Sequence, residues 1–406
     1  MRKLHVVWVI VVCALATLVA GALAARTSDP GVTATSITIG GTIPLSGPAS
    51  AYASVGRGAG AYFSYVNSKG GVNGRKIVYK YVDDQYNAAL TVTATKQLVE
   101  QDKVFAIYNS LGTEHNLAIR DYLNQLNVPQ LFTATGATTF GRDYKQYPWT
   151  IGYQPSYVGE SKIYGQYIAK TTPSAKIAIL YQDDDYGKDL IRGLQVGLRG
   201  KASIVAQQGY DVRTASDVQS QMAELKASGA DTFMVFATPK FAIQSLVFAR
   251  KLGWKPHVFM NTVSSASNIM FIASEGGTNP VAEGAISVTF LKDPDDKQWA
   301  SDAAIKLYRT IMKRYAPGQN VKDVYNVYGM ASAYTLLDAL KKAGKNLTRD
   351  GLMKAARSLN ETDNPFVLPG VVVKTSATDG FPIQQGRLQR YSKGHWTLFG
   401  PLAGTG

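Results

Sequence analysis

The sequence predicts an α/β protein built from two doubly wound lobes. Short apolar runs alternate with segments whose apolar residues recur at helical spacing, and this alternation continues from Ser36 to about residue 260. The alternation restarts after Tyr153-Gln154-Pro155, so we expect one parallel sheet before that point and another after it. A chain of 406 residues is long enough for two domains.

The elements of the first lobe follow in order. A strand beginning at Ile37 ends at Pro44-Leu45-Ser46-Gly47-Pro48, and a helix follows with apolar residues between Val55 and Val66. Gly70-Gly71 ends this helix, and Asn73-Gly74 turns the chain into the next strand. The other elements expected here are strands at 76–84, 104–108 and 128–132 and a helix at about 113–126.

The second lobe shows the same alternation. We expect strands at 177–181, 204–206, 232–236, 258–260 and 285–290, with helices near 187–199, 216–228 and 239–252. Helices at about 297–315, 321–342 and 349–358 come next, and a turn-rich β segment ends the chain. These last helices are expected to return to the first lobe, and the last strands to the second.

The N-terminus has the layout of a secretory signal peptide. Arg2 and Lys3 precede an apolar run that ends in small residues, so we expect cleavage near Ala24; the alternative is an uncleaved membrane anchor. The single cysteine, Cys13, lies inside this run and does not follow the small residues that precede a lipidated cysteine. The mature protein is therefore expected to be exported, without disulfides or lipid.

Composition argues against nucleic-acid binding and catalysis. The net charge is +14, but Lys and Arg are scattered singly, with no basic stripe that would follow a phosphate backbone. His115, His257 and His395 are far apart and lack metal-site spacing, so we expect neither metal nor cofactor. The run Gly56-Arg57-Gly58-Ala59-Gly60 has the wrong spacing for a nucleotide fingerprint, and we interpret it as close helix packing.

Three stretches resemble the branched-chain amino-acid-binding proteins, a family of type I periplasmic solute-binding proteins of ABC transporters. They are Pro44 to Pro48 with Tyr52 beyond, Tyr65 to Asp84 with its Gly70-Gly71-Val72-Asn73-Gly74-Arg75 core, and Asp185-Tyr186-Gly187. The order of strands and helices also fits this family from about Ile37 to Phe399.

The resemblance implies two Rossmann-like lobes joined by three crossovers, near 153–155, 288–291 and 364–371. With the signal peptide expected at residues 1–24, it places lobe 1 at 36–154 plus 291–363 and lobe 2 at 155–290 plus 364–400. It also implies a Leu/Ile/Val-binding-like periplasmic protein, without enzymatic activity, that closes on a small ligand and delivers it to an ABC permease. We expect a monomer.

Loops rich in small hydroxyl residues follow the third and fourth strands. Ligands of open α/β sheets bind beyond the carboxyl ends of the strands, and a helix start with a hydroxyl beside it suits a carboxylate. In the family, matching loops grip the ligand's carboxylate. The matched positions are Ser110, Thr113, Thr135, Gly136, Ala137 and Thr138. The alternative is that Ser110 and Thr113 only cap their helix.

Aromatic residues are expected to enclose the body of the ligand. Tyr52, Tyr186, Phe236 and Tyr325 match or neighbour the family's ligand-enclosing rings. The alternative for each is ordinary packing, because the chain has 23 tyrosines.

One departure from the family concerns the ammonium of the ligand. Amino-acid binders of the family carry an acidic residue shortly after the strand that here ends at Met260, whereas this chain reads Asn261-Thr262-Val263-Ser264-Ser265. A buried ammonium without an anionic partner is costly, so Val263 marks a changed specificity. We expect a small carboxylate or amide with an aliphatic or aromatic body, with branched-chain amino acids as the competing ligands if Asp183, Asp184 or Asp185 substitutes. The alternative function is a ligand-sensing receptor subunit with the same fold.

Overall fold

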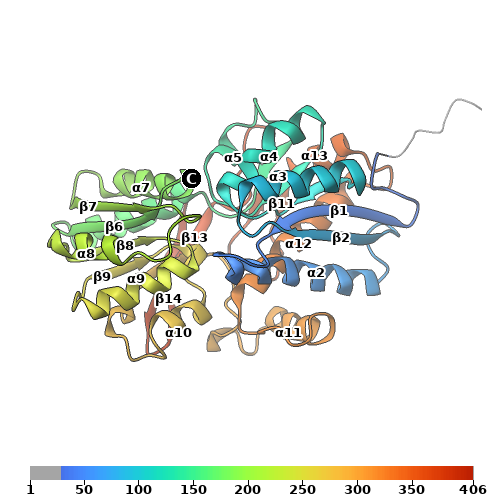
Figure 1. Cartoon of the computed structure of the whole chain (residues 1–406). Coiled ribbons are helices and arrows are strands. Elements are labelled where there is room, and N and C mark those ends of the chain that lie inside the picture. Colours follow the sequence, from blue (N-terminus) through green and yellow to red (C-terminus); the bar gives the residue numbers. More distant parts are fainter. Residues whose placement is uncertain (1–28, 406) are drawn as a thin grey trace, which may run out of the picture.

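The computed structural model describes residues 29–405 and contains two α/β lobes lying side by side (Figure 1). The sheet of lobe 1 is parallel and has the strand order β2-β1-β3-β4-β5. The sheet of lobe 2 has the order β14-β13-β10-β9-β8-β6-β7, in which β13 and β14 alone are antiparallel to their neighbours. The predicted fold class is confirmed.

The first lobe contains the N-terminal strands and the late helices. Its strands are β1 (Ser36–Ile43), β2 (Lys76–Asp83), β3 (Ala106–Tyr108), β4 (Gln130–Thr133), β5 (Thr150–Gly152) and the small pair β11 (Asn360–Glu361) and β12 (Val373–Lys374). Its helices are η1 (Ser50–Tyr52), α2 (Ala53–Ser68), α3 (Ala88–Lys96), η2 (Gln97–Gln101), α4 (Thr113–Gln125), α5 (Thr139–Arg142), η5 (Lys297–Trp299), α11 (Ala303–Tyr315), α12 (Val324–Ala343) and α13 (Arg349–Ala356).

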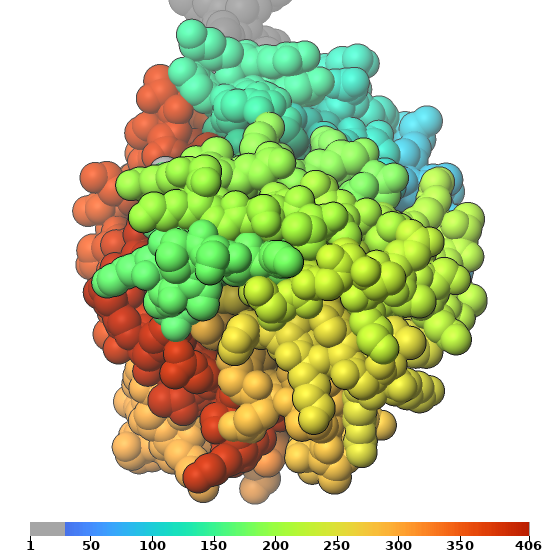
Figure 2. Space-filling view, turned by 90° about the vertical axis from the view of Figure 1, so that its left-hand side faces the viewer, coloured from blue at the N-terminus to red at the C-terminus, as the bar shows by residue number. Residues whose placement is uncertain are grey.

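The second lobe contains the middle of the chain and its last strands. Its strands are β6 (Lys176–Gln182), β7 (Ser203–Tyr210), β8 (Thr232–Phe236), β9 (His257–Met260), β10 (Ile286–Thr289), β13 (Gln385–Ser392) and β14 (His395–Gly404). Its helices are α6 (Tyr157–Thr171), α7 (Asp185–Leu198), α8 (Gln219–Ala227), α9 (Pro239–Lys251), η3 (Thr262–Ser264), α10 (Ser267–Ala273) and η4 (Pro280–Ala282). Figure 2 looks onto the outer end of this lobe, where the green and yellow middle of the chain lies beside the red C-terminal strands.

The sequence does not predict α3, because its composition is unfavourable for a helix. Thr91, Val92, Thr93 and Thr95 are β-branched, which lowers intrinsic helix propensity. The helix forms because the side chain of Asn87 accepts a 2.9 Å hydrogen bond from the Ala89 N–H at its start, and because α3 lies against α4. Tertiary packing overrides local propensity here.

Glycines allow α2 and α12 to pack closely in lobe 1. A Cβ atom added to Gly58 would lie 2.2 Å from the carbonyl oxygen of Asn326, and one added to Gly329 would lie 2.1 Å from that of Val55. Within the Gly56 to Gly60 run, Gly58 therefore serves close helix packing, whereas Gly56 faces Ile43 and Tyr81 of the sheet and Gly60 has only an ordinary 3.9 Å contact with Tyr81. The contact of α2 with α12 also holds the start of α12, which carries cavity residues, against lobe 1.

Three segments connect the lobes: one between β5 and α6, one after β10, and one that precedes β13. The second and third lie side by side, since Leu291 forms a β-bridge with Val367 and the Leu368 N–H donates a 2.8 Å hydrogen bond to the Phe290 carbonyl. Beyond them, β12 pairs with β11, and the Thr375 hydroxyl donates a 2.6 Å hydrogen bond to the Ala356 carbonyl in lobe 1. The crossover positions and the lobe ranges given above stay a prediction.

No helix within residues 29–405 is long and apolar enough to cross a membrane. The expected signal peptide, with Cys13 and the cleavage position near Ala24, lies outside the described residues.

Candidate ligand-binding site

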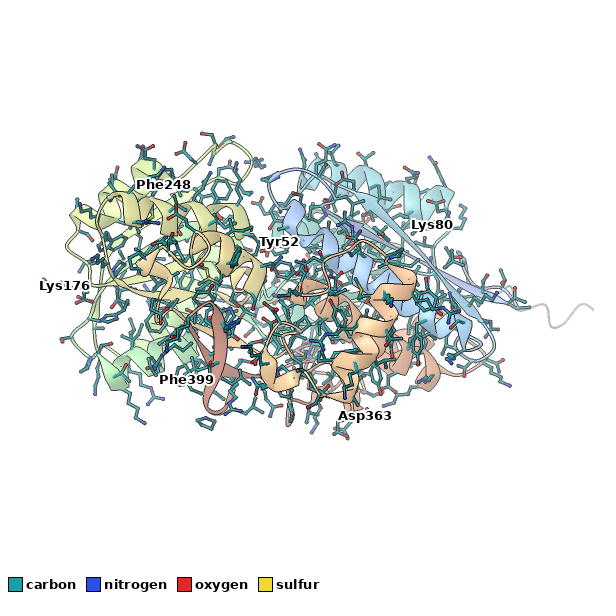
Figure 3. All side chains as sticks on the ribbon, turned by 90° about the horizontal axis from the view of Figure 1, so that it is seen from below. Tyr52, Lys80, Lys176, Phe248, Asp363 and Phe399 are labelled. Carbon is teal, nitrogen blue, oxygen red and sulfur yellow. The ribbon has the colours of Figure 1, made fainter. Side chains whose placement is uncertain are left out.

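A cavity lies between the lobes, at the carboxyl ends of strands from both sheets. Lobe 1 contributes the loops after β3 and β4 and the first turn of α12, and lobe 2 contributes the loops after β9 and β10. Tyr52, at the end of η1, lies between the two lobes (Figure 3). The cavity is therefore where ligands of open α/β sheets are expected to bind.

Tyrosine rings form much of the cavity wall. Six of the lining residues are tyrosines: Tyr52, Tyr86, Tyr157, Tyr186, Tyr325 and Tyr328. The ring centroids of Tyr52 and Tyr325 are 5.2 Å apart in an edge-to-face arrangement, and those of Tyr157 and Tyr186 are 4.9 Å apart. Such walls desolvate an apolar or aromatic ligand body.

Two of these tyrosines have hydroxyl groups without a close hydrogen bond. The hydroxyls of Tyr52 and Tyr328 are buried and make no close hydrogen bond among the described residues; Ser264 lies near the Tyr52 hydroxyl and Asn109 lies near the Tyr328 hydroxyl. Burial raises the pKa of both phenols well above the usual value, so both hydroxyls stay protonated and able to donate. Because buried polar groups are normally paired, both are available to a polar group of a ligand.

The first turn of α4 provides the polar end of the cavity in lobe 1. Thr113 opens this helix, and its hydroxyl oxygen lies 2.7 Å from that of Thr135. N–H groups in the first turn of a helix have no acceptor within the helix, and the helix dipole favours an anion beside them. Gly112 and Thr113 both line the cavity, so this turn can hold a carboxylate.

The structure brings five of the eleven predicted site residues to the cavity wall. They are Tyr52, Thr113, Tyr186, Val263 and Tyr325.

The other six predicted residues lie behind the wall or away from it. The Ser110 hydroxyl accepts the Thr42 N–H at 3.0 Å, so Ser110 holds lobe 1 together and does not cap α4. Phe236 is fully buried in the core of lobe 2. Thr135 supports Thr113 through their hydroxyl contact and accepts the N–H of Ala137 at 3.1 Å.

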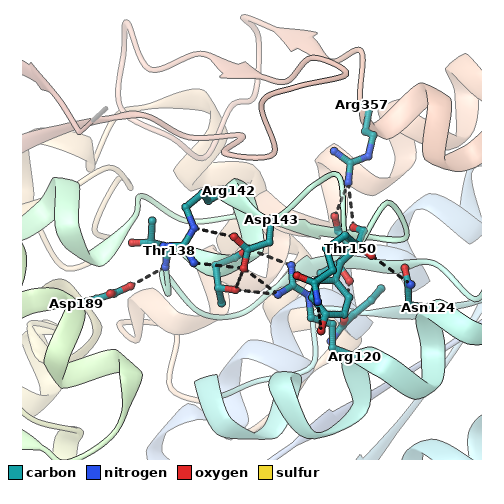
Figure 4. Close-up of polar contacts among 12 residues, drawn as sticks. Arg120, Asn124, Thr138, Arg142, Asp143, Thr150, Asp189 and Arg357 are labelled. Carbon is teal, nitrogen blue, oxygen red and sulfur yellow. Dashed lines mark hydrogen bonds and ion pairs between the residues drawn. The ribbon is translucent and has the colours of Figure 1, made fainter.

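Gly136 and Thr138 lie where the two lobes meet, outside the cavity lining. The carbonyl of Gly136 accepts the Tyr157 N–H at 2.7 Å, which ties the loop after β4 to the start of α6. The N–H of Thr138 donates to Oδ2 of Asp189, on α7 of lobe 2, at 2.7 Å (Figure 4). These residues connect the lobes and do not form part of the cavity wall.

Several lining residues were not predicted. Tyr86, Tyr157, Tyr328 and Gln154 belong to segments without a motif, and only their place after strands or at lobe crossings could have indicated them. The most consequential is Asp293, which follows β10 in the segment that leads back to lobe 1. The departure after Met260 therefore does not leave the cavity without a carboxylate.

The cavity lining is acidic. Asp293 is its one carboxylate, and none of its lining residues is Lys, Arg or His. Burial raises the pKa of Asp293 from its usual value to about 6. Among the described residues, no group of three or more His, Cys, Asp and Glu side chains is placed to hold a metal ion.

A second buried acid lies directly behind the wall. Oε1 of Glu160 on α6 accepts the Thr262 N–H at 2.7 Å and the Tyr164 hydroxyl at 2.8 Å. Burial raises the pKa of Glu160 to about 7. Because Thr262 lines the cavity, Glu160 fixes the position of the loop after β9.

Comparison with known proteins supplies the family. A family model described as periplasmic binding protein matches residues 36–395 of this chain. The chain belongs to this family. The Leucine-specific-binding protein of Salmonella typhimurium is 27% identical over 333 residues, which cover 76% of this periplasmic binding protein and 88% of the relative. Leu/Ile/Val-binding protein homolog 7 of Brucella abortus is 23% identical, with 80% and 82% covered.

Another relative matches over a shorter stretch. Leu/Ile/Val-binding protein homolog 3 of Brucella melitensis is 27% identical over 199 residues, so the match spans about half of that relative, 52% of its length, and 48% of this chain. These relatives are named as binding proteins and not as enzymes. The family assignment implies a periplasmic location.

Solved structures agree on the fold. A branched-chain amino-acid ABC transporter protein from Thermus thermophilus with bound valine has a TM-score of 0.80 at 18% identity, covering 92% of this chain and 97% of that one. A fatty acid ABC transporter substrate-binding protein from Thermomonospora curvata has a TM-score of 0.77 at 21% identity, covering 93% and 95%. At these identities, the two structures support the two-lobed fold and leave the ligand open.

Proposed function

We propose that this periplasmic binding protein is the solute-binding component of an ABC importer. Its ligand is a small carboxylate or amide, either a branched-chain amino acid or a related aliphatic or aromatic compound. The observation that carries the proposal is the interlobe cavity, in which a tyrosine wall lies beside the first turn of α4. This combination suits a ligand with one anionic or polar end and an apolar body.

Different residues of the cavity bind the polar end and the apolar body of the ligand. The first-turn N–H groups of α4 and the Thr113 hydroxyl orient a carboxylate or amide oxygen, supported by Thr135. The faces of the tyrosine rings cover the ligand body and exclude water. The hydroxyls of Tyr52 and Tyr328, which make no close hydrogen bond within the protein, can each bond a polar group of the ligand.

Closure of the lobes would convert binding into a signal for transport. A ligand held by lobe 1 gains the contacts of lobe 2 only when the lobes meet, so it shifts the population toward the closed form. A membrane permease then receives the closed, loaded protein, which acts as a monomer. The same closure would serve a receptor subunit, but no feature of the cavity favours that role over transport.

The test is a thermal-unfolding screen of the mature protein against amino acids, amides, aliphatic acids and aromatic acids, followed by solution scattering with the best ligand. A native-state ligand raises the unfolding temperature. We expect at least one class to do so and to reduce the radius of gyration. A stabilising ligand that leaves the radius unchanged at saturation would contradict the closure mechanism, and no stabilisation by any class would contradict the proposed ligand class.

A further inference from the structure

Glu160 places a buried carboxyl group directly behind the lobe 2 side of the cavity wall. The residue is 2% exposed. Its Oε1 accepts the Thr262 N–H at 2.7 Å and the Tyr164 hydroxyl at 2.8 Å. Because Thr262 itself lines the cavity, the carboxyl group lies one hydrogen bond behind the wall.

The hydrogen bond from Thr262 connects Glu160 to the place where the lobes meet. The Thr262 hydroxyl donates to the carbonyl of Val288 on β10 at 2.7 Å, which fixes the loop after β9 a second time. The carbonyl of the next residue, Val263, accepts the Tyr325 hydroxyl of lobe 1 at 2.7 Å. Glu160 therefore supports a segment that takes part in the contact between the lobes.

Burial, and not a neighbouring charge, sets the protonation of Glu160. Among the ion pairs of the described residues, none includes Glu160. Burial is the largest cause of its raised pKa, and the hydrogen bonds from Thr262 and Tyr164 oppose this effect. Strand β10 and the loop 261–265 carry no titratable residue, and the one titratable residue of β9, His257, is exposed.

The helices around Glu160 add no opposing charge. On α7, which packs against α6, Asp189 pairs with Arg192 at 2.7 Å. On α6 itself, burial raises the pKa of Tyr157 and Tyr164 far above neutrality, so both phenols stay protonated. The other charged residues of these two helices, which form no ion pair with Glu160, are Lys162, Lys170, Asp185 and Lys188. The access of water to Glu160 therefore decides its charge.

We propose that closure of the lobes on the ligand takes up a proton at Glu160, so that ligand capture depends on pH. This inference rests on the proposed function, in which the lobes separate and close. In the open form water reaches the wall at Thr262, directly in front of Glu160, whereas the ligand and lobe 1 cover this wall in the closed form. Closure therefore increases the burial of the carboxyl group.

The direction of the pH dependence follows from this burial. The pKa of Glu160 is about 7 where the lobes meet, and hydration in the open form moves it toward the ordinary value of 4.5. Between the two values the closed form keeps a proton that the open form releases. Ligand affinity is therefore highest below the pKa of the open form and falls as pH rises through about 7.

Calorimetry of the full mature protein tests this proton uptake. Leucine, phenylalanine, 4-methylpentanoate and 3-phenylpropanoate are the probes, and the tightest of them is used further. Its dissociation constant is measured at about pH 6 and about pH 8 for the wild type, Glu160→Gln and Glu361→Gln. Two buffers of different ionisation enthalpy give the number of protons taken up. Thermal unfolding without ligand verifies that each variant is folded.

Glu361→Gln is the matched control. Glu361 is a buried acid of lobe 1, and burial raises its pKa to about 7 as well. Its Oε1 accepts hydrogen bonds from Thr335 at 2.9 Å and from Asn364 at 2.7 Å, and neither of these residues lines the cavity. The control therefore removes a similar buried acid that has no bond to the wall.

We expect the affinity of the wild type to fall about three- to tenfold more between the two pH values than that of Glu160→Gln. The wild type should also take up more protons on binding than this variant. Asp184 and Asp293, whose pKa values are raised by burial, are present in both proteins, so their contributions cancel. Glu361→Gln should behave as the wild type does.

Two results would overturn the inference and leave the proposed function standing. One is an equal pH dependence and equal proton uptake in the wild type and Glu160→Gln. The other is the same loss of pH dependence in Glu361→Gln, which would show that the effect is not specific to the cavity wall. No binding of any of the four probes would overturn both this inference and the proposed function.

Discussion

The hydroxyl of Tyr325 on α12 donates a 2.7 Å hydrogen bond to the carbonyl of Val263, in the loop after β9. The bond joins lobe 1 to lobe 2 across the edge of the ligand cavity, and both residues line that cavity. It can form only when the lobes meet. The bond therefore stabilises only the closed form. Because the ligand also favours the closed form, this bond strengthens ligand binding.

Tyr325→Phe is expected to weaken ligand binding about 2- to 10-fold, since a net hydrogen bond contributes about 0.5–1.5 kcal/mol. The ring stays, so its contact with Tyr52 is kept. Calorimetry with a stabilising ligand measures the change. Tyr315→Phe is the matched control, because that hydroxyl bonds Ser68 within lobe 1 at 2.9 Å. Equal dissociation constants for Tyr325→Phe and the wild type would show that this bond does not contribute to closure.

A second contact between the lobes joins the Thr138 N–H to Asp189 at 2.7 Å, as Figure 4 shows. Asp189→Ala removes a charged acceptor, so we expect ligand affinity to fall about tenfold. The variant should also need more ligand to reach the closed radius of gyration in a scattering titration. Asp183→Ala provides the control, because the Asp183 carboxylate pairs at 3.0 Å with Lys188 of its own lobe. Closure of Asp189→Ala at the wild-type ligand concentration would contradict a role in closure.

The sequence predicts those parts of the fold whose local pattern agrees with their packing. Strand β8 has the predicted bounds, Thr232 to Phe236, because a continuous apolar run suits a strand buried on both faces. Helix α3 could not be predicted in the same way, since contact with α4 stabilises a threonine-rich segment of low propensity. Where contacts with other elements determine the secondary structure of a segment, its local sequence does not predict that structure.

The site shows the same difference between residues that a local motif indicates and residues whose place depends on tertiary contacts. Tyr52 and Tyr186 lie in motifs shared with the family, and both reach the cavity. The Ser110 hydroxyl does not, because it accepts the Thr42 N–H, and no sequence pattern reveals that partner. Asp293 enters the cavity through the passage between lobes, so its role depends on how the lobes meet, which the order of residues does not show.

Close packing of α2 against α12 leads to a stability prediction. Gly58→Ala would place a methyl group 2.2 Å from the Asn326 carbonyl oxygen, so the helices must separate. We expect the free energy of unfolding to fall by about 1–3 kcal/mol in chemical denaturation. Gly60→Ala is the matched control on the same helix, because its nearest contact would be an ordinary 3.9 Å to Tyr81. That variant should be neutral or slightly more stable, since Ala favours a helix. Equal stability of the two variants would argue against close packing as the role of Gly58.

Buried Glu160 makes the stability of the protein depend on pH. Its pKa is about 7 in the folded protein, against an ordinary value of 4.5, because burial disfavours the charged form. Between these values the folded protein keeps a proton that the unfolded chain releases. The contribution of Glu160 to the free energy of unfolding is therefore fully present below about pH 4.5 and is lost as pH rises toward 7.

Glu160→Gln should remove this dependence. A glutamine keeps the oxygen that accepts the Thr262 N–H and the Tyr164 hydroxyl, and it carries no charge at any pH. The free energy of unfolding of the wild type minus that of the variant should therefore fall by up to about 3 kcal/mol between pH 4.5 and 7 and stay level above that range. Glu361 and Asp184, whose pKa values are also raised by burial, are present in both proteins, so their contributions cancel in the difference. Urea denaturation at half-unit pH intervals measures it, with Glu224→Gln on the exposed face of α8 as the control. A difference that is flat with pH, or that rises, would show that Glu160 is not held protonated by burial behind the cavity wall.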